Sequence, residues 1–166
     1  MRILIVGATA WLALTPVADA SKVETRHLTA TTSVRQGRIA PGTRTSLFVE
    51  IAPKPKMHVY APQQDTYVPV SVTLKDSRAF RAERPVFPKP EKFFFAPLKE
   101  TQLVYSSPFK IAVEVTLASA AALRQAGIKP ATTLQIDGTL RYQACDDEIC
   151  YLPESVPVSW TLQVDK

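Results

Sequence analysis

The stretch "FKIAVEVTL", residues 109–117, decides the fold class, because its apolar and polar residues alternate with a period of two. Side chains of a β-strand point alternately to opposite faces, so this alternation predicts a strand that buries one face. The predicted buried face consists of every second residue: Phe109, Ile111, Val113, Val115 and Leu117. The segment is therefore expected to border a hydrophobic core.

Similar alternation recurs on both sides of this segment. It is clear in "SLFVEI" (46–51), "LQIDGTLRY" (134–142) and "VPVSWTLQV" (156–164). Further candidate strands lie at 27–34, 57–61 and 68–74. About seven short strands in one chain favour a sandwich of two β-sheets. The predicted fold class is therefore all-β.

Two segments depart from the strand pattern. The Ala-rich run "ASAAALRQAG" (118–127) predicts one short helix that ends at Gly127. Residues 78–107 are rich in proline and aromatic residues but have no period, which predicts a long loop or a run of short edge strands. Three consecutive phenylalanines within that segment argue against disorder.

The N-terminus has the three parts of a secretory signal. Arg2 precedes an apolar run from Ile3 to Leu14, and the small residues Ala18 and Ala20 end the segment. The apolar run is shorter than the about 20 residues that a spanning helix needs. We therefore expect residues 1–20 to be cleaved, leaving one exported domain, residues 21–166, that does not insert into a membrane.

The formal net charge of +5 raises the question of a nucleic-acid partner. The lysines and arginines are scattered among proline and glutamate, without a basic helix or an aromatic platform between them. This distribution is typical of a solvated surface, so no nucleic-acid partner is expected.

Both cysteines of the chain lie in "YQACDDEICYLPES" (142–155), with four residues between Cys145 and Cys150. Because secreted proteins keep disulfides, the two cysteines are expected to form one. The simplest interpretation is a structural staple, although closing so short a loop stabilises a protein by only about 2 kcal/mol. A metal site and a redox-active pair are the alternatives.

Strand parity predicts which cysteine is exposed. Continuing the alternation from Tyr142 places the Cys145 side chain outward, where a thiolate could attack it. Counting back from Val156 places Cys150 inward, so the parity must break between these two residues. Pro153 is the expected point of interruption.

The metal alternative lacks ligands. A closed zinc site takes four, and the chain offers two cysteines and two distant histidines, His27 and His58. His58 follows Met57 and could join a soft copper site, which leaves a copper-handling protein as a minor alternative. The sequence predicts no metal and no cofactor.

The redox alternative must account for three acidic residues, Asp146, Asp147 and Glu148, between the cysteines. Negative charge disfavours a thiolate and raises the pKa of a thiol. Such a pair is a poor spontaneous nucleophile, but its disulfide can be reduced when the low-pKa thiolate of a partner attacks it. We expect partner docking to provide the selectivity.

Two segments resemble a known family. "YQACDDEICYLPESVPV" (142–158) and "KPKMHVYAP" (54–62) are similar to the N-terminal periplasmic domain of the thiol-disulfide interchange protein DsbD. The resemblance implies an immunoglobulin-like sandwich in which Cys145 and Cys150 cycle between disulfide and dithiol. It implies two kinds of partner, a membrane-embedded electron donor and thioredoxin-like periplasmic proteins, and it favours a thiol-disulfide oxidoreductase.

The resemblance also implies residues around the cysteines. An aromatic cap loop covers the pair in this family, and Phe93, Phe94 and Phe95 in "EKFFFAPL" match it best. His58 and Tyr60 fall where aromatic residues of an earlier strand flank the family's site. The sequence departs from the family in having four residues between the cysteines, where the best-known members have five.

A further departure is that the 166 residues include no membrane domain and no thioredoxin-like domain. The electron donor is therefore expected to be a separate partner. The alternative from another functional class is a non-catalytic binding or adaptor domain in which the disulfide is only structural.

Overall fold

A computed structural model describes residues 21–64 and 66–166 of the chain. The predicted signal segment, residues 1–20, lies outside the described residues. Within the described residues, no helix is both long and apolar enough to cross a membrane.

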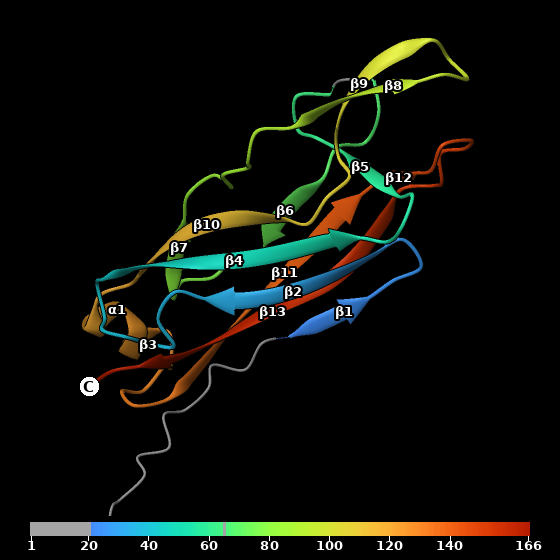
Figure 1. Ribbon diagram of the computed structural model, residues 1–166. Helices are drawn as coiled ribbons and strands as arrows, with labels where there is room; N and C mark the ends of the chain where they lie inside the picture. The colour runs from blue at the N-terminus through green and yellow to red at the C-terminus, as the bar shows by residue number, and fades with distance from the viewer. Residues whose placement is uncertain (1–20, 65) are drawn as a thin grey trace, which may run out of the picture.

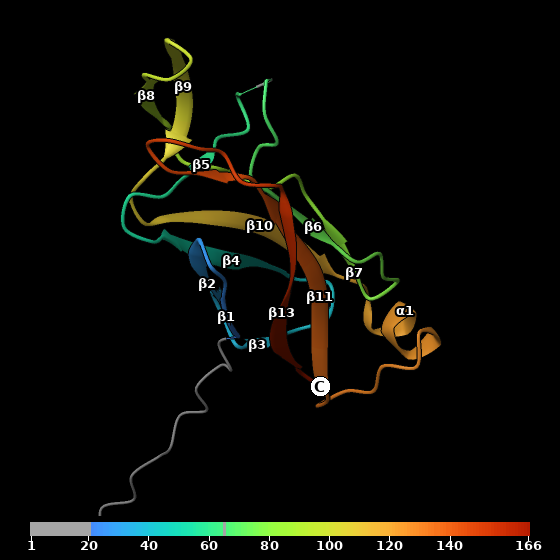
Figure 2. The same cartoon turned by 90° about the vertical axis from the view of Figure 1, so that its right-hand side faces the viewer.

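Two larger sheets pack against each other as a sandwich (Figures 1 and 2). The first contains, in spatial order, β1 (Lys22–Glu24), β2 (Leu28–Val34), β4 (Arg44–Pro53), β10 (Phe109–Leu117) and β7 (Phe80–Ala82). The second contains β3 (Arg38–Ile39), β13 (Glu154–Val164), β11 (Thr133–Tyr142) and β6 (Ser71–Leu74). The all-β sandwich expected from the alternating segments is confirmed.

The core lies between these sheets, as the alternation predicts. All five residues of the predicted buried face of β10 are buried, and Ile111 and Val113 pair with Val49 and Leu47 of β4. From the opposite sheet, the buried Trp160 ring packs into the same core and donates its indole N–H to the Phe48 carbonyl, at 2.9 Å. The buried indole nitrogen is thereby satisfied, and the bond joins the two sheets.

The predicted helix is present as α1 (Ala120–Gln125). The Ser119 hydroxyl accepts a hydrogen bond from the Ala122 amide at 3.3 Å and caps its start. Gly127 follows the helix with φ +79°, a conformation that glycine adopts without strain, and the Ile128 amide closes the end on the Leu123 carbonyl. The prediction that Gly127 ends the helix is confirmed.

The proline- and phenylalanine-rich segment forms short strands, the second of the two predicted possibilities. It contributes β7 and a hairpin of β8 (Glu91–Phe95) and β9 (Glu100–Tyr105). The hairpin joins β5 (His58–Tyr60) and β12 (Ala144–Cys145) in a third, smaller sheet of order β12-β5-β9-β8. In both views this sheet lies at the end of the molecule opposite α1 (Figures 1 and 2).

Candidate functional site

The two cysteines meet in the small third sheet. Cys145 lies in β12 and pairs in register with His58 of β5, and it forms a disulfide with Cys150. Cys145 and Cys150 also form an isolated antiparallel bridge, so the chain reverses direction between them. The expected disulfide is therefore present, at the edge of a sheet and outside the main core.

The prediction from parity that Cys145 is exposed is wrong. Its side chain is fully buried, whereas Cys150 is half-buried. Parity fails because Gln143 leaves the strand: its side chain accepts a hydrogen bond from the Val68 amide and donates one to the Tyr151 carbonyl. The chain then enters a different sheet at Ala144, so alternation counted along β11 does not extend to Cys145. Cys150 is the more accessible sulfur.

The Tyr60 hydroxyl lies within hydrogen-bond distance of both sulfur atoms of the disulfide. It is 3.0 Å from Cys145 Sγ and 3.1 Å from Cys150 Sγ. Neither sulfur of a disulfide carries a hydrogen, so Tyr60 is the donor, and its single O–H is shared between the two sulfurs. Burial, with Tyr67 and Glu100 nearby, raises the pKa of Tyr60 well above its ordinary value of 10.0. The phenol therefore keeps its proton and can donate a hydrogen bond to a sulfur at neutral pH.

Tyr67, Glu100 and Gln102 fix the position of the Tyr60 ring. The Tyr67 ring is stacked on the Tyr60 ring, with centroids 4.3 Å apart and planes 3° from parallel. The Tyr67 hydroxyl donates to the Glu100 carboxylate, which also accepts from the fully buried Gln102 side chain at 3.1 Å. The Glu100 hydrogen bond raises the pKa of Tyr67 as well. These contacts hold the Tyr60 ring in one position.

His58 and Phe93 lie beside the disulfide on the same sheet. The His58 ring is tilted against Phe93 with centroids 4.5 Å apart, and its edge meets Tyr60 at 6.0 Å. Phe93 is half-buried and packs in one cluster with Tyr60, Cys145 and Cys150. Burial lowers the pKa of His58 below 6.5, partly opposed by Asp147 and Asp146. His58 is therefore neutral at physiological pH and places no positive charge beside the sulfurs.

The three phenylalanines matched to the cap lie in β8 and differ in exposure. Phe93 packs with the cysteines, while Phe94, the next residue on the strand, is 62% exposed. Phe95 is buried. Because neighbouring side chains of a strand point to opposite faces, Phe94 points away from the disulfide. Only Phe93 of the three is in the cysteine cluster.

The loop between the cysteines is organised by Asp146. Its carboxylate accepts the backbone N–H groups of Glu148 and Ile149, both at 2.8 Å, and the Tyr151 hydroxyl at 2.8 Å. These bonds, led by the Ile149 amide, lower the pKa of Asp146 to about 2. Asp146 thus closes the turn and leaves Asp147 and Glu148 at the surface.

Tyr151 anchors the second cysteine to the sandwich. Its amide donates to the Ala144 carbonyl at 2.9 Å, and its ring lies on the buried His27 ring with centroids 4.4 Å apart. His27 Nδ1 is in turn 3.1 Å from the carboxylate of Glu154. The position of Cys150 is therefore set by contacts on both sides of the loop.

Four of these supporting residues were not identified from the sequence: Tyr67, Glu100, Gln102 and Tyr151. His27 was considered there only as a possible metal ligand. A weak signal existed for Gln102, because it occupies the same face of β9 as the buried Val104, where an apolar residue is the rule. The remaining residues come together only through the hairpin and the loop. Among the described residues, no three His, Cys, Asp or Glu side chains gather as a set of metal ligands.

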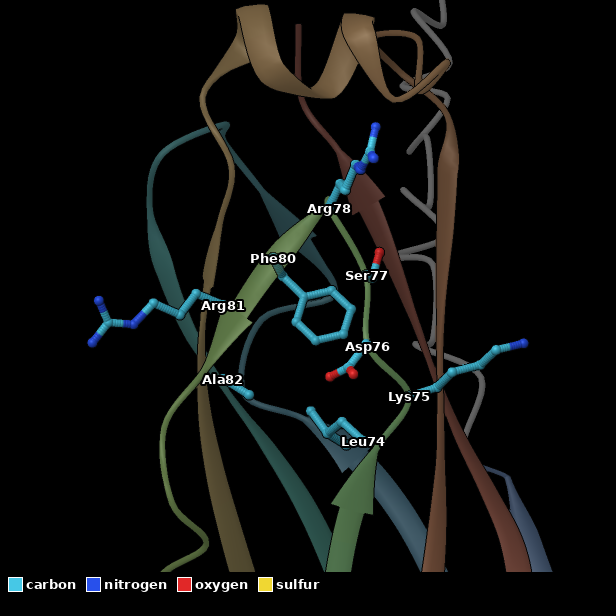
Figure 3. Close-up of a pocket in the computed structure, with 8 residues that line it drawn as sticks. All are labelled: Leu74, Lys75, Asp76, Ser77, Arg78, Phe80, Arg81 and Ala82. Carbon is cyan, nitrogen blue, oxygen red and sulfur yellow. The ribbon is translucent and has the colours of Figure 1, made fainter.

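A cavity of about 590 Å³ lies elsewhere, between the edge strands β6 and β7 (Figure 3). The Phe80 ring and the Leu74 side chain point into it, while Arg81 and Lys75 point outward. Its lining includes no cysteine and no residue of the third sheet. The disulfide is thus at a projecting edge and not in this cavity.

Comparisons with known proteins agree with a thiol-disulfide site. A sequence model described as "Thiol:disulfide interchange protein DsbD, N-terminal" matches residues 25–160. No curated protein matches the chain.

Among solved structures, the N-terminal periplasmic domain of ScsB from Proteus mirabilis is similar, with a TM-score of 0.58 and 12% identity over 88% of this chain. The chain spans about half of that structure, 51%. The reduced N-terminal domain of Neisseria meningitidis DsbD matches with a TM-score of 0.44 and 16% identity, covering 71% of this chain and 82% of that one.

The similarity to the ScsB domain shows a shared fold. The match to the DsbD N-terminal family covers most of the chain and includes both cysteines. The disulfide, with one buried and one partly exposed cysteine beside a tyrosine donor, lies in the matched region. The chain therefore belongs to the family of DsbD N-terminal domains, a family of thiol-disulfide exchange domains.

Proposed function

We propose that residues 21–166 are a single periplasmic domain, released from a signal peptide, that carries electrons through the Cys145–Cys150 disulfide. It receives them from a membrane-embedded donor and passes them to thioredoxin-like proteins. The observation that carries this proposal is the asymmetry of the disulfide: Cys150 is partly exposed, whereas Cys145 is fully buried, with the Tyr60 hydroxyl at hydrogen-bond distance from its sulfur.

Reduction of the domain begins when a partner thiolate attacks Cys150 Sγ, the accessible sulfur. A bond forms between the partner sulfur and Cys150, the Cys145–Cys150 bond breaks, and its electron pair remains on Cys145 Sγ. A buried thiolate is costly in free energy unless it accepts a hydrogen bond. The Tyr60 hydroxyl already lies 3.0 Å from Cys145 Sγ and supplies that bond.

The second step releases the partner. The other cysteine thiolate of the same partner then attacks the partner's sulfur in the mixed disulfide. Cys150 leaves as a thiolate, and the two partner cysteines form a disulfide. Two electrons have moved to the domain, and Cys145 and Cys150 take protons from water to become thiols. The reverse sequence, starting with the Cys150 thiolate, reduces an oxidised thioredoxin-like protein.

Phe93 and the acidic loop account for selectivity. Phe93 packs over the cluster that contains both sulfurs, and Asp147 and Glu148 are exposed beside them. Negative charge near a sulfur disfavours the approach of anionic thiolates. A partner that docks and displaces the Phe93 side chain gains access that a small thiol lacks.

Two single-cysteine variants test the proposal. Cys145→Ala keeps the accessible Cys150 and is expected to form a mixed disulfide with a thioredoxin that has one cysteine activated by thionitrobenzoate. Cys150→Ala keeps only the buried sulfur and is expected to react much more slowly. If both variants are folded and neither is captured, the domain is not a thiol-disulfide carrier.

A reduction potential separates this function from that of an adaptor with a structural disulfide. Structural disulfides have potentials below about −300 mV, while exchanging ones are higher. Equilibration of the wild-type protein with glutathione or thioredoxin buffers is expected to give a value above about −300 mV.

A further inference from the structure

Two large apolar side chains are exposed on the loop that carries the accessible cysteine. Ile149 is 54% exposed and Leu152 is 87% exposed, one residue before and two residues after Cys150. Single exposed apolar residues are common on protein surfaces. Two exposed apolar residues that flank a reactive sulfur are less common. They are available for contact with the molecule that reaches the sulfur.

A protein that attacks Cys150 comes close to these two residues. Exchange requires the partner sulfur to come within bonding distance of Cys150 Sγ, and successive Cα atoms are about 3.8 Å apart. The transient interfaces of redox partners are small, below about 600 Å² on each partner, but such a patch is still wider than that separation. The contact surface is therefore continuous with the disulfide and includes Ile149 and Leu152.

The acidic residues on the same loop indicate the charge that a partner surface should have. Asp146 is occupied by the turn, but Asp147 and Glu148 are exposed and form no ion pair within the described part of the chain. The chain as a whole has a net charge of +5, whereas the loop between the cysteines has three acidic residues and no basic one. Complementary charge across an interface raises the rate of association.

We propose that Ile149 and Leu152, bordered by Asp147 and Glu148, are the docking surface for a thioredoxin-like protein whose apolar active-site face is edged with Lys or Arg. This inference rests on the proposed function and specifies the chemistry of its partner. Glutathione, a small anionic thiol, gains neither the apolar contact nor the attraction. The same surface therefore favours protein partners over the thiol pool.

Two double variants test the surface. Ile149→Ser/Leu152→Ser removes the apolar contact, and Asp147→Asn/Glu148→Gln removes the charge; all four side chains are exposed, so the fold is expected to persist. The probes are a reduced thioredoxin with lysines introduced beside its active site, the same thioredoxin with glutamates at those positions, glutathione and dithiothreitol. The measurement is the rate constant for reduction of the disulfide.

The apolar variant is expected to slow reduction by the lysine-edged thioredoxin about tenfold and to change the dithiothreitol rate less than about twofold. The charge variant is expected to slow the lysine-edged probe about fivefold at low ionic strength, to lose most of its salt dependence, and to react faster with glutathione. The wild type is expected to prefer the lysine-edged probe to the glutamate-edged one.

Matched controls lie away from the disulfide. Val86→Ser removes a side chain that is 63% exposed and pairs with Ala112 of β10, and Asp76→Asn/Glu83→Gln removes two acidic groups near β7. Neither is expected to change any rate. Unchanged thioredoxin rates in both test variants, or equal losses with dithiothreitol, would overturn the docking surface. If the wild type itself is not reduced by either thioredoxin, the proposed function fails instead.

Discussion

The Tyr60 hydroxyl lies 3.0 Å from Cys145 Sγ, and the Cys145 side chain has no exposed surface. Water therefore cannot solvate charge that develops on this sulfur when the disulfide opens. The Tyr60 hydrogen bond is the polar contact in place to do so. This relationship makes Tyr60 a candidate catalytic residue, since it touches a reacting atom.

Tyr60→Phe is expected to slow reduction of the disulfide about fivefold, because a hydrogen bond to a charged group is stronger than one to a neutral sulfur by about 1 kcal/mol. The reduced variant is also expected to show a higher thiol pKa at Cys145, measured by thiolate absorbance. Tyr67→Phe is the matched control, because the Tyr67 hydroxyl bonds to Glu100. Equal effects of both substitutions would contradict a direct role for Tyr60.

Phe93→Ala is expected to increase the rate at which glutathione reduces the disulfide several-fold, since Phe93 packs with both cysteines. Phe94→Ala supplies the control: it removes the same side chain from the next residue, which is 62% exposed. A stopped-flow measurement of thiol-dependent reduction distinguishes them. A cap role for Phe93 is excluded if the two variants have the same rate as the wild type.

His58 predicts a pH dependence of stability. Burial lowers the pKa of His58 below 6.5, so below that pH the unfolded chain binds a proton more readily than the folded one. The free energy of unfolding must then fall as the pH drops through about 6.5. Urea titrations from about pH 7.5 to about pH 5.5 are expected to show a smaller fall for His58→Phe than for the wild type.

Titration of Asp146 does not affect the comparison between the wild type and His58→Phe. The pKa of Asp146 is lowered to about 2, so this residue stays ionised throughout the range. Its own stabilising effect is present above the ordinary value of 3.8 and is lost as the pH falls toward 2. Parallel stability curves for the wild type and His58→Phe would show that His58 does not titrate as described.

Gly138→Ala is expected to destabilise the sandwich by about 1–3 kcal/mol. A Cβ atom at Gly138 would lie 2.8 Å from the Thr73 carbonyl oxygen and 3.1 Å from the Trp160 ring, so β11 and β6 would have to move apart. Denaturant unfolding measures the loss. Thr139→Val, at the next and exposed residue, is expected to change stability by less than about 0.5 kcal/mol.

The sandwich was predictable because its strands are half-buried over long runs. In Phe109–Leu117 the alternation matches β10 at both ends, since one face meets the core throughout. The hairpin of β8 and β9 was less predictable, because a small sheet at the end of the molecule buries few residues. There the pattern of Glu91–Phe95 carries no clear period.

The site was predictable only in part. The two cysteines, His58, Tyr60 and Phe93 were identified, mainly through family resemblance, and they lie together. The exposure of Cys145 was predicted wrongly, because alternation holds only while the chain stays in one sheet. Gln143 ends that continuity through side-chain bonds to distant backbone groups, which local sequence does not encode.

The disulfide packs in a cluster with Tyr60, Val104 and Phe93 that is distinct from the main core between the sheets. Closing a loop this short contributes little to global stability, about 2 kcal/mol. An electron carrier must keep its shape through every turnover, and a bond placed at the periphery can open and close without repacking the sandwich. Under the proposed function, durability over many redox cycles would follow from where the chain places its two sulfurs.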